Sequence, residues 1–316
     1  MEQEINEESR RTDGAEPQEG SQAAELQEEK QPEGKKKKEK EKKSLGMEIL
    51  SWVWTILIAV AAALVIRSFI FEPVRVDGAS MNDTLENGEV MFVSKWNYAS
   101  TWLSFPWQDD DTKENAPRLA TGFGAPKQFD VVICRYPGRG DTNFVKRLIG
   151  MPGDRVRIEG GYLYINDQKY EEPYISDEYR TGSGAEFSEA YIPKKGDLLS
   201  LEYTDDSQSS IGVYVNGEGW GWRGISSKAT AEDGSTLVYH RDGRLLLNGE
   251  DITTDLEAIK GLVGKKFTLD QDLYFVMGDH RNNSNDSRAQ GPITRDMLVG
   301  QVQFVFFPFG SARGVK

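Results

Sequence analysis

The sequence predicts a mainly β protein that is preceded by one membrane-spanning helix, and two observations carry this prediction. Short runs of β-branched and aromatic residues, separated by Gly-containing turns, recur from about residue 90 to the end of the chain. Before them lies one uncharged apolar run, Ile49 to Ile66, close to the about 20 residues that a helix needs to cross the hydrocarbon core of a bilayer. Helical periodicity outside this run is weak and occurs around Asp255–Gly261.

The composition narrows the class of protein. A length of 316 residues suggests one large domain or two. The net charge of −13 argues against nucleic-acid binding, which requires a basic surface, so we expect no nucleic-acid partner. A single cysteine, Cys134, excludes an internal disulfide framework, and with two histidines it argues against a structural zinc site. We expect neither a metal nor another cofactor.

The N-terminal 46 residues are expected to form a cytoplasmic tail. Residues 1–34 are rich in Glu, Gln, Ser and Gly, and they hold too few large apolar side chains to offset the entropy of ordering. A lysine-rich run, Lys35–Lys43, follows directly before the apolar segment. Because cytoplasmic flanks of membrane helices carry an excess of Lys and Arg, this run predicts a cytoplasmic N-terminus.

Residues 47–72 are expected to form the membrane helix. Trp52 and Trp54 lie near one end, as interfacial anchors do, and the long stem of Arg67 can reach the headgroups at the other. Pro73 should end the helix. The run starts late and is longer than the apolar region of a cleaved signal peptide, and no comparable run follows it. The chain is therefore predicted to cross the cell membrane once, with everything after Pro73 outside the cytoplasm.

The remaining strands are read from β-rich runs. In chain order the expected strands are Val90–Val93, Val131–Cys134, Phe144–Ile149, Val156–Ile158, Tyr162–Ile165, Leu198–Tyr203, Gly212–Val215, Leu237–His240, Leu245–Leu247, Leu273–Met277 and Val299–Phe307. Five dipeptides suit hairpin turns: Gly160-Gly161, Asn216-Gly217, Asp233-Gly234, Asp242-Gly243 and Asn248-Gly249. We expect residues 73–175 and 273–316 to form one β core, and residues 176–272 to form an inserted β subdomain. The aromatic stretch 96–107 suits either a packed loop or a loop that enters the outer headgroup layer.

A candidate nucleophile, Ser80, follows the apolar segment closely. It lies on a Gly-containing turn within Val74–Leu85. A serine hydroxyl becomes a nucleophile only when a base takes its proton. Asp83 prevents a Ser-x-x-Lys motif, and Asn82 prevents a Gly-x-Ser-x-Gly elbow. The local spacing alone is therefore a weak signal, and most serines after a glycine are turn formers.

A candidate base lies in the run Asn143–Asp154, where Lys146 and Arg147 are flanked by apolar residues. Side chains alternate faces along a strand, so one of the two points where its apolar neighbours point. A lysine aimed inward is desolvated, which favours the neutral amine that a general base requires. The competing interpretation is a surface lysine on an edge strand.

A third polar cluster is the loop Gly278–Arg288, which combines hydrogen-bonding groups of both signs. Asp286 and Arg288 could form an ion pair that holds the loop, and Ser284 could orient an amine. The simpler interpretation is a salt-bridged turn.

Taken together and in this order, the three stretches resemble the bacterial type I signal peptidases, which are membrane-bound Ser/Lys proteases, and in particular the Gram-positive ones. The resemblance runs from about residue 49 to residue 309. The residues that carry it are Ser80-Met81 with Thr84-Leu85, Lys146-Arg147 with Gly150 and Pro152-Gly153-Asp154, the Gly278–Arg288 loop, Phe129–Ile133, Gly291-Pro292-Ile293, Leu298-Val299-Gly300 and Pro308.

The resemblance implies roles for individual residues. Ser80 matches the nucleophile and Lys146 the general base, and no metal or cofactor is needed. Ser284 matches a serine that hydrogen-bonds the lysine amine, and Asp286 with Arg288 matches a structural ion pair. The backbone N–H of Ser80 would donate to the oxyanion.

The resemblance also implies a substrate. Signal peptides of exported preproteins would be cleaved after small residues at −1 and −3, at the surface of the lipid bilayer. A second oxyanion donor must come from elsewhere, because Gly78 stands where some members have a serine. The apolar substrate groove would be lined by Val74, Val76, Met81, Leu85, Phe144 and Val145.

Two residues depart from the usual pattern of this family. Asp83 stands where a proline is usual, which loses a rigid turn and is expected to place a carboxylate near the Ser/Lys pair. A nearby anion favours protonated lysine and would work against the base. His280 stands where asparagine is commoner, which raises the alternative of a Ser/His pair.

Two other functions remain open at this point. One is a catalytically silent relative that acts as a scaffold at the cell surface, although such a relative would be expected to lack Ser80 or Lys146. The other is a self-cleaving repressor-type Ser/Lys protease. The membrane anchor and the lack of a DNA-binding segment in the sequence argue against the second.

Overall fold

The computed structural model describes residues 45–69, 71–95, 100–102, 118–120, 124–136, 142–222, 224–240 and 242–315. The chain divides into two compact units, Met1–Trp52 and Val53–Lys316. The predicted acidic tail and lysine run lie outside the described residues. Of the aromatic stretch 96–107, only Ser100–Trp102 is described, as strand β3.

The apolar run forms helix α1, Leu45–Phe69, and Gly46–Ile66 within it is long and apolar enough to cross a membrane. The helix ends at Phe69 rather than at residue 72. Pro73 does not stop it, because Pro73 lies inside strand β1 (Phe71–Arg75), paired with Phe92. An edge strand tolerates proline since one row of its backbone groups faces away from the sheet.

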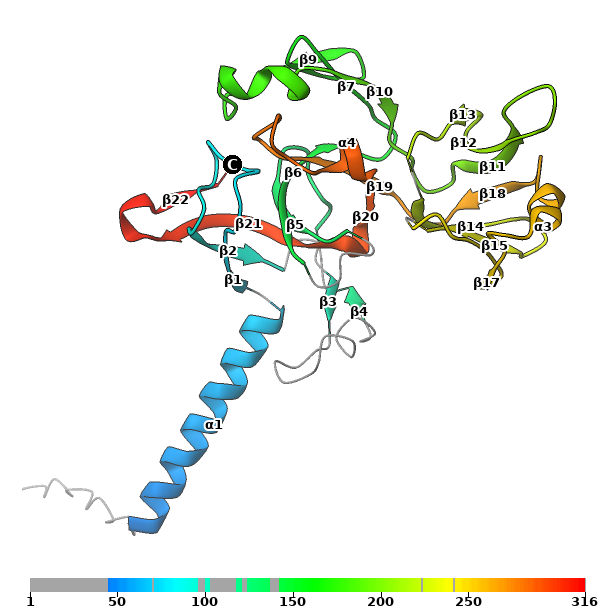
Figure 1. The fold of residues 1–316 in the computed structure, drawn as a ribbon. Helices are drawn as coiled ribbons and strands as arrows, with labels where there is room; N and C mark the ends of the chain where they lie inside the picture. The colour runs from blue at the N-terminus through cyan, green and yellow to red at the C-terminus, as the bar shows by residue number, and fades with distance from the viewer. Residues whose placement is uncertain are drawn as a thin grey trace, which may run out of the picture. The chain divides into compact units, whose positions relative to one another are not determined.

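The main sheet combines strands from both ends of the chain. Its order is β1-β2-β21-β5-β6-β19-β20, with β22 paired to β21. The bounds of its strands after β1 are β2 (Val90–Ser94), β5 (Val131–Cys134), β6 (Phe144–Gly150), β19 (Leu273–Met277), β20 (Ile293–Thr294), β21 (Leu298–Phe307) and β22 (Arg313–Gly314). Figure 1 shows β21, in red, running beside β2 and β5. Strand β6 lies in the interior of the sheet, between β5 and β19.

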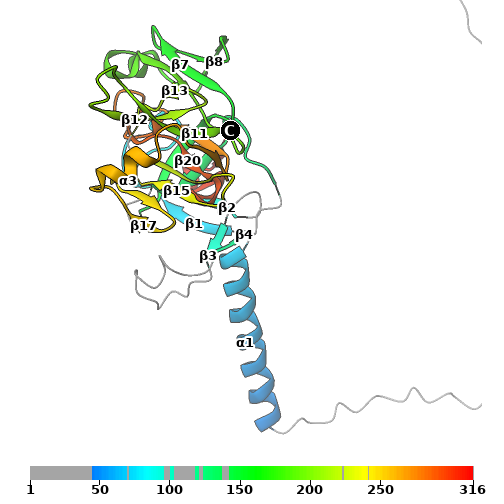
Figure 2. The same ribbon diagram turned by 90° about the vertical axis from the view of Figure 1, so that its right-hand side faces the viewer.

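Three further sheets complete the strands that the structure describes. A four-stranded sheet has the order β10-β7-β8-β9, a second eight-stranded sheet has the order β13-β12-β11-β18-β14-β15-β16-β17, and β3 pairs with β4. The bounds are β4 (Arg118–Ala120), β7 (Arg155–Glu159), β8 (Tyr162–Ile165), β9 (Gln168–Tyr170), β10 (Phe187–Tyr191), β11 (Leu198–Tyr203), β12 (Ile211–Val215), β13 (Glu218–Gly219), β14 (Ile225–Thr230), β15 (Thr236–Tyr239), β16 (Leu245–Leu247), β17 (Glu250–Asp251) and β18 (Lys266–Leu269). All strands of the second eight-stranded sheet come from residues 198–269. Figure 2 labels five of them, β11, β12, β13, β15 and β17.

Helices are short in the described residues after α1. They are α3 (Leu256–Gly261), α4 (Ser287–Gln290) and the 3-10 turns η1 (Asp177–Arg180), η2 (Gly182–Gly184), η3 (Arg295–Met297) and η4 (Phe309–Ser311). Asp255 caps α3, because its side chain accepts a hydrogen bond from the N–H of Ala258. The weak helical periodicity around residues 255–261 therefore marked a real helix.

The mainly β fold class is confirmed, and so is each of the eleven expected strands to within a residue or two. The hairpin turns explain part of this agreement. At Gly160-Gly161, Asn216-Gly217 and Asn248-Gly249 both residues have positive φ, as a type I′ turn requires. The proposed domain boundaries stay a prediction.

Both faces of strand β5 are buried. Val131 and Ile133 belong to one hydrophobic cluster, and Val132 and Cys134 belong to another. Since successive side chains point to opposite faces, a strand covered on both sides reads as an unbroken apolar run. This burial matters for the site, because β5 is the neighbour of β6, which carries Lys146.

Candidate active site

Ser80 lies on a folded loop that follows β1. The base of this loop is closed by two backbone bonds, from Val76 N–H to the Glu89 carbonyl (2.8 Å) and from Gly88 N–H to the Val76 carbonyl (2.9 Å). Inside it, the N–H of Leu85 donates to the Met81 carbonyl (2.7 Å). Ser80 is half-buried at the turn itself. We call residues 76–89 the nucleophile loop. The backbone bonds at its base hold the turn that carries the Ser80 hydroxyl.

Strand β6 brings Lys146 to this hydroxyl. The Nζ atom lies 2.7 Å from Ser80 Oγ, and it donates a second hydrogen bond to the Val145 carbonyl at 2.8 Å. The lysine is only 2% exposed. Among the described residues no carboxylate lies within 4.0 Å of it, so its amine is buried without an ion-pair partner.

Burial holds the pKa of the Lys146 amine below its ordinary value of 10.5. The thiol of Cys134 and the carboxylates of Asp286 and Asp279 oppose this shift, whereas the guanidinium of Arg288 adds to it. Desolvation is the largest of these effects, and it favours the neutral amine. A neutral amine at hydrogen-bond distance can accept the proton of a serine hydroxyl.

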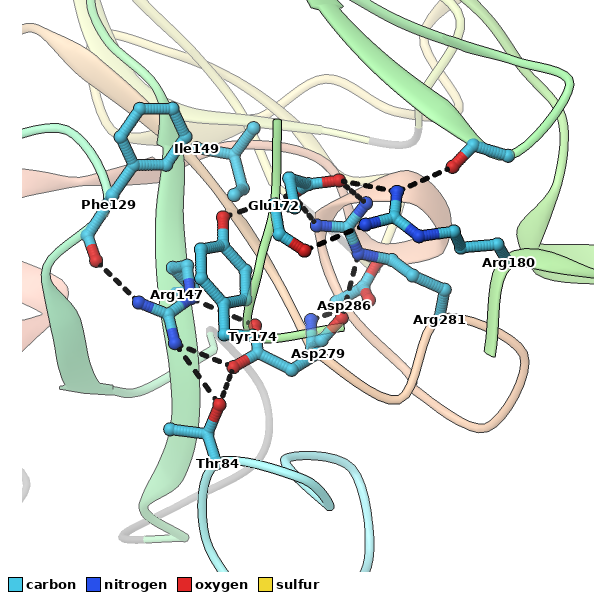
Figure 3. Close-up of polar contacts among 12 residues, drawn as sticks. Thr84, Phe129, Arg147, Ile149, Glu172, Tyr174, Arg180, Asp279, Arg281 and Asp286 are labelled. Atoms are coloured by element: carbon cyan, nitrogen blue, oxygen red, sulfur yellow. Dashed lines mark hydrogen bonds and ion pairs between the residues drawn. The ribbon is translucent and has the colours of Figure 1, made fainter. Parts of the chain in front are cut away.

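The sequence allowed one of Lys146 and Arg147 to be buried, but the structure buries both. Arg147 is fully buried and forms a two-pronged ion pair with Asp279, with Nε–Oδ1 at 3.0 Å and Nη2–Oδ2 at 2.7 Å. It also donates to the Phe129 carbonyl and to Thr84 Oγ1, and Thr84 in turn donates to Asp279 (Figure 3). This pair ties β6 to the nucleophile loop and to the loop after β19.

A second layer of buried charge covers Arg147. The ring of Tyr174 lies over the guanidinium, 3.6 Å from ring centre to carbon, and its hydroxyl donates to Glu172 (3.1 Å). Glu172 is 1% exposed, and its carboxylate accepts hydrogen bonds from both terminal nitrogens of Arg281. The backbone carbonyl of Glu172 accepts a hydrogen bond from Arg180 Nη2 (Figure 3). Each buried carboxylate here has a guanidinium partner, as buried charges require.

The loop after β19 passes close to the nucleophile loop at Gly278. A Cβ atom at this position would lie 2.5 Å from the Ser80 carbonyl oxygen and 2.3 Å from Ser284 Oγ, so glycine is required there. The N–H of Gly278 donates to Asp286 Oδ2 at 3.0 Å. Arg288 donates from Nε to Oδ1 and from Nη2 to Oδ2 of Asp286, each at 2.9 Å. The expected pairing of Asp286 with Arg288 is therefore present in the geometry.

Burial alone would raise the pKa of the Asp286 carboxyl, but the hydrogen bonds and charge of Arg288 hold it below its usual value. The N–H of Gly278 and the hydroxyl of Ser284 act in the same direction. Asp286 is thus a fixed anion. It also caps α4 through a hydrogen bond from the N–H of Arg288.

Ser284 lies beside the site but is not brought to the lysine amine by a hydrogen bond. Its hydroxyl is buried next to Gly278, whereas the Lys146 amine contacts Ser80 and Val145. Its role as a partner of the amine stays a prediction.

The six residues expected to line the substrate groove fall into two groups. Val74, Phe144 and Val145 are partly exposed. Val76, Met81 and Leu85 are 4%, 2% and 0% exposed and belong to the hydrophobic core beneath the nucleophile loop. A substrate could contact the second group only if the core opened, so their side chains serve packing in this conformation.

Asp83 does not act where the sequence suggested. It is exposed, and Oδ2 accepts a hydrogen bond from the backbone N–H of Ser176 at 2.9 Å. The main charges that act on the pKa of Lys146 are those of Cys134, Asp286, Asp279 and Arg288. The φ of Asp83 is +78°, a conformation that proline cannot adopt because its ring fixes φ near about −65°.

His280 contacts the nucleophile loop through its backbone and its ring. Its N–H donates to the Ser80 carbonyl (3.1 Å), and its Nδ1 lies 3.0 Å from the Ala79 carbonyl. Among the described residues no hydrogen bond joins the ring to Ser80 Oγ. The ring stacks on Tyr179, with centroids 3.8 Å apart and an interplanar angle of 22°.

Sequence reasoning missed the residues that complete the buried charge network. Glu172 and Tyr174 follow a short hairpin with no periodicity or motif around them, so no local signal identified them. Arg313, near the end of the chain, also reaches the site: it donates to the Thr84 carbonyl (2.7 Å) and pairs with Glu89. Within the described residues, no group of three or more His, Cys, Asp or Glu could hold a metal ion.

A family model described as "Signal peptidase, peptidase S26" matches residues 49–307. Signal peptidase I T of Bacillus subtilis (strain 168) is 32% identical over 272 residues, which is 84% of this chain and 90% of that protein. Signal peptidase I P of Bacillus subtilis subsp. natto is 29% identical, over 85% of this chain and 94% of its own length.

A more distant relative is the signal peptidase I of Streptococcus pneumoniae, 28% identical over 81% of this chain and 92% of that protein. Among solved structures, a signal peptidase I from Enterococcus faecalis V583 is 21% identical and covers 56% of this chain and 96% of its own. Its TM-score is 0.27, which is too low to support an argument about the fold.

The family match covers well over half of the chain, and it includes Ser80, Lys146 and the Gly278–Arg288 loop. A peptidase is a hydrolase, and the one apolar helix in the described residues is compatible with a membrane anchor. The chain therefore belongs to the signal peptidase family, peptidase S26, as a bacterial type I signal peptidase.

Proposed function

We propose that this protein is a serine endopeptidase that removes N-terminal signal peptides from exported preproteins, with Ser80 as the nucleophile and Lys146 as the general base. One observation carries the proposal: the amine of Lys146 is buried, has no carboxylate partner among the described residues and lies 2.7 Å from the Ser80 hydroxyl. A serine needs a base within hydrogen-bond reach, and a lysine can be that base only when it is neutral.

The proposed reaction is acyl transfer in two steps. Neutral Lys146 takes the proton of Ser80 as Oγ attacks the carbonyl carbon of the last residue of the signal peptide, and Lys146 then protonates the leaving amine of the mature protein. The signal peptide is left as an ester on Ser80. Lys146 next takes a proton from water, which attacks the ester, and the proton returns to Ser80 Oγ.

The negative oxygen that forms during attack needs hydrogen-bond donors. Among the described residues no acceptor takes the backbone N–H of Ser80, so it is available as one donor. Gly78 has no side chain that could be a second donor, and its backbone N–H already donates to Asn87 Oδ1 (3.1 Å). The proposal therefore assigns the first donor only.

The Asp286–Arg288 pair supports the reaction indirectly. It holds Gly278 through a backbone hydrogen bond, and Gly278 packs against Ser80. Asp286 raises the pKa of Lys146 and Arg288 lowers it, so the pair adds little net charge to the site. Ser284 lies in the same loop with its hydroxyl buried beside Gly278, and we propose that it supports the Lys146 amine during the reaction.

The substrate groove is proposed to lie along Val74, Phe144 and Val145, which are the partly exposed members of the predicted set. Shallow apolar surface of this kind suits small side chains, and we propose Ala or similar residues at −1 and −3 of the preprotein. Replacing either Ala by Trp in a substrate should reduce cleavage at least about tenfold.

The reaction is proposed to take place at the outer surface of the cell membrane. α1 would be the anchor, with the lysine run on the cytoplasmic side. In the described residues, Phe71, Phe304, Phe307 and Phe309 are exposed, by 40%, 41%, 47% and 81%. Exposed aromatic rings next to a membrane segment favour contact with lipid over contact with water.

The Ser/His alternative is less well supported. Nδ1 of His280 donates to the Ala79 carbonyl, which can only accept. Among the described residues no hydrogen bond joins the other ring nitrogen, Nε2, to Ser80 Oγ, whereas Lys146 Nζ lies 2.7 Å from that oxygen. The scaffold alternative gains no support, since both members of the proposed pair are present and in contact. No described feature favours a self-cleaving repressor.

The test is cleavage of a purified preprotein with an Ala-x-Ala site in detergent micelles, comparing wild type, Ser80→Ala, Lys146→Ala and His280→Ala. Loss of a nucleophile or a general base should lower kcat by at least about 100-fold, whereas His280→Ala should lower it by no more than about tenfold. Equal cleavage by all four proteins would refute the assignment. Activity that survives Lys146→Ala but not His280→Ala would establish the Ser/His alternative instead.

A further inference from the structure

One segment connects the nucleophile loop to the rest of the site from outside the main sheet. Residues 171–184 run between β9 and β10 and include η1 and η2. We call them the strap. The strap has no paired strand, yet it makes side-chain contacts with the nucleophile loop, with Arg147 and with the loop after β19.

The strap is firmly anchored at its own ends. At its start, Glu172 is buried in an ion pair with Arg281, and Tyr174 covers Arg147. At its end, a Cβ atom at Gly184 would lie 2.7 Å from backbone and side-chain atoms of Arg281, so the two chains are in direct contact there. The strap is thus a fixed support rather than a loose loop, and a neighbour that binds it is held in place.

The first link from the nucleophile loop to the strap is direct. Asp83 accepts a hydrogen bond from the N–H of Ser176, the residue before η1. This N–H is at the open end of a helical turn and has no partner within the turn. Asp83 adopts a positive φ, a conformation that costs a non-glycine residue energy. In this conformation its carboxylate contacts the strap.

The second link passes through His280. On one side, its backbone N–H and its Nδ1–H hold the carbonyls of Ser80 and Ala79. On the other side, its ring stacks on Tyr179, in the same 3-10 turn that begins after Ser176. One link therefore starts at Asp83, after Ser80, and the other starts at the carbonyls of Ala79 and Ser80. Both end at the η1 turn of the strap, at Ser176 and at Tyr179.

We propose that Asp83 and His280 are positioning residues that hold the Ser80 turn against the strap, so that Oγ stays within reach of the Lys146 amine. This inference rests on the proposed function. Neither residue touches the hydroxyl or the amine, so their effect is on geometry: a turn free to shift by about 1 Å would lose much of the reaction rate. Because the two links run in parallel, either one alone keeps most of the order, and losing both should cost more than the product of the single losses.

Variants separate the hydrogen bond of Asp83 from its backbone conformation. Asp83→Gly keeps the positive φ without strain but removes the acceptor, whereas Asp83→Asn keeps an acceptor oxygen and tolerates this φ. Tyr179→Leu removes the stack and leaves the bonds of His280 to the loop. The matched control is Asp167→Gly, an exposed aspartate at φ +65° in the β8–β9 turn, away from the site.

Steady-state cleavage of a preprotein is the first readout. Asp83→Gly and Tyr179→Leu should each lower kcat about three- to tenfold with KM within about twofold, because orientation and not binding is lost. The double variant should lose more than the product of the two, at least about 100-fold. Asp83→Asn should restore kcat to within about twofold of wild type, and Asp167→Gly should match wild type. Equal losses in Asp83→Gly and Asp83→Asn, or a double variant within about twofold of wild type, would overturn the inference.

Amide hydrogen exchange across residues 171–184 is the second readout, and it does not depend on catalysis. In a Ser80→Ala background, exchange at Ser176 should rise in Asp83→Gly and in Tyr179→Leu but not in Asp167→Gly. Unchanged exchange in the first two would contradict the links even if the enzyme works as proposed. If Ser80 and Lys146 proved dispensable for cleavage while the exchange pattern appeared as expected, the proposed function would fail and the links would stand.

Discussion

The main sheet and the second eight-stranded sheet place their charged side chains differently. Around the main sheet, Lys146, Arg147, Asp279 and Asp286 are at most 2% exposed, and all but the lysine have an ion-pair partner. In the second sheet the ion pairs lie at the surface: Arg244 and Asp242 are each about half exposed, and so is Glu218, which pairs with Arg155.

The contrast between the two sheets shows where the fold keeps charged groups that are costly to bury. A buried charge is expensive, and a fold keeps one only where excellent geometry compensates it or where its chemistry is used. A surface pair costs little and adds little. The main sheet therefore carries the groups that the proposed reaction uses, while the second sheet shows the charge distribution of an ordinary globular surface.

The largest expected effect comes from breaking a buried pair. Asp279→Ala would remove the carboxylate that pairs with the buried Arg147 guanidinium, and we expect it to lower the free energy of unfolding by about 3–5 kcal/mol in urea titrations. The matched surface change, Glu218→Gln, should cost about 0–1 kcal/mol. Similar losses in the two variants would remove the contrast between the sheets. The pair Arg147→Met with Asp279→Leu should recover part of the loss, because two apolar side chains need no partners.

The next effect concerns Lys146, whose buried amine has no ion-pair partner among the described residues. Because burial lowers the pKa of Lys146, the unfolded chain binds more protons than the folded one in the window between this lowered pKa and 10.5. The stability of the wild type should therefore rise with pH through that window. Lys146→Met should abolish this rise, be more stable than wild type at lower pH and lack activity. Urea titrations at a series of pH values would measure it, and identical slopes for both proteins would show that Lys146 titrates normally.

The smallest effect tests whether the two sheets are coupled. Trp222, from the segment before β14, donates from Nε1 to the Arg288 carbonyl (3.1 Å) and packs against Phe275 of β19. Trp222→Phe keeps an aromatic ring and removes the hydrogen bond, so we expect a loss of about 0.5–1.5 kcal/mol in stability and kcat within about threefold of wild type. A large loss of activity at unchanged stability would mean that the second eight-stranded sheet takes part in catalysis, which would contradict the contrast drawn between the two sheets.

Local patterns were enough for much of the fold. β5 was predicted with its observed bounds because both of its faces are covered, which makes the whole run apolar. Strands with a polar or broken pattern were missed. β14 reads Ile-Ser-Ser-Lys-Ala-Thr, and β1 contains Pro73. Such strands form because a partner strand supplies their hydrogen bonds, and the partner is distant in the sequence.

The candidate site was only partly predictable for the same reason. Ser80 and Lys146 were identified through a family resemblance, and their contact joins residues that are 66 positions apart. Asp83 was expected to oppose the base, but its carboxylate is directed at Ser176. Met81 and Leu85 were expected to face the substrate, but they are buried in the core.

The apolar segment that forms α1, the β-rich body, most of the hairpin turns and the residue types of the site could all be predicted from local sequence patterns. These depend on interactions within a few positions along the chain, which periodicity and turn residues report directly. Only the packing of distant segments buries both Lys146 and Arg147 and brings the strap against the nucleophile loop. The same packing gives Arg147 an ion pair with Asp279 and leaves Lys146 without an ion-pair partner among the described residues. Burial and ion pairing depend on what packs around a side chain, and here the packing partners come from segments up to 132 residues away.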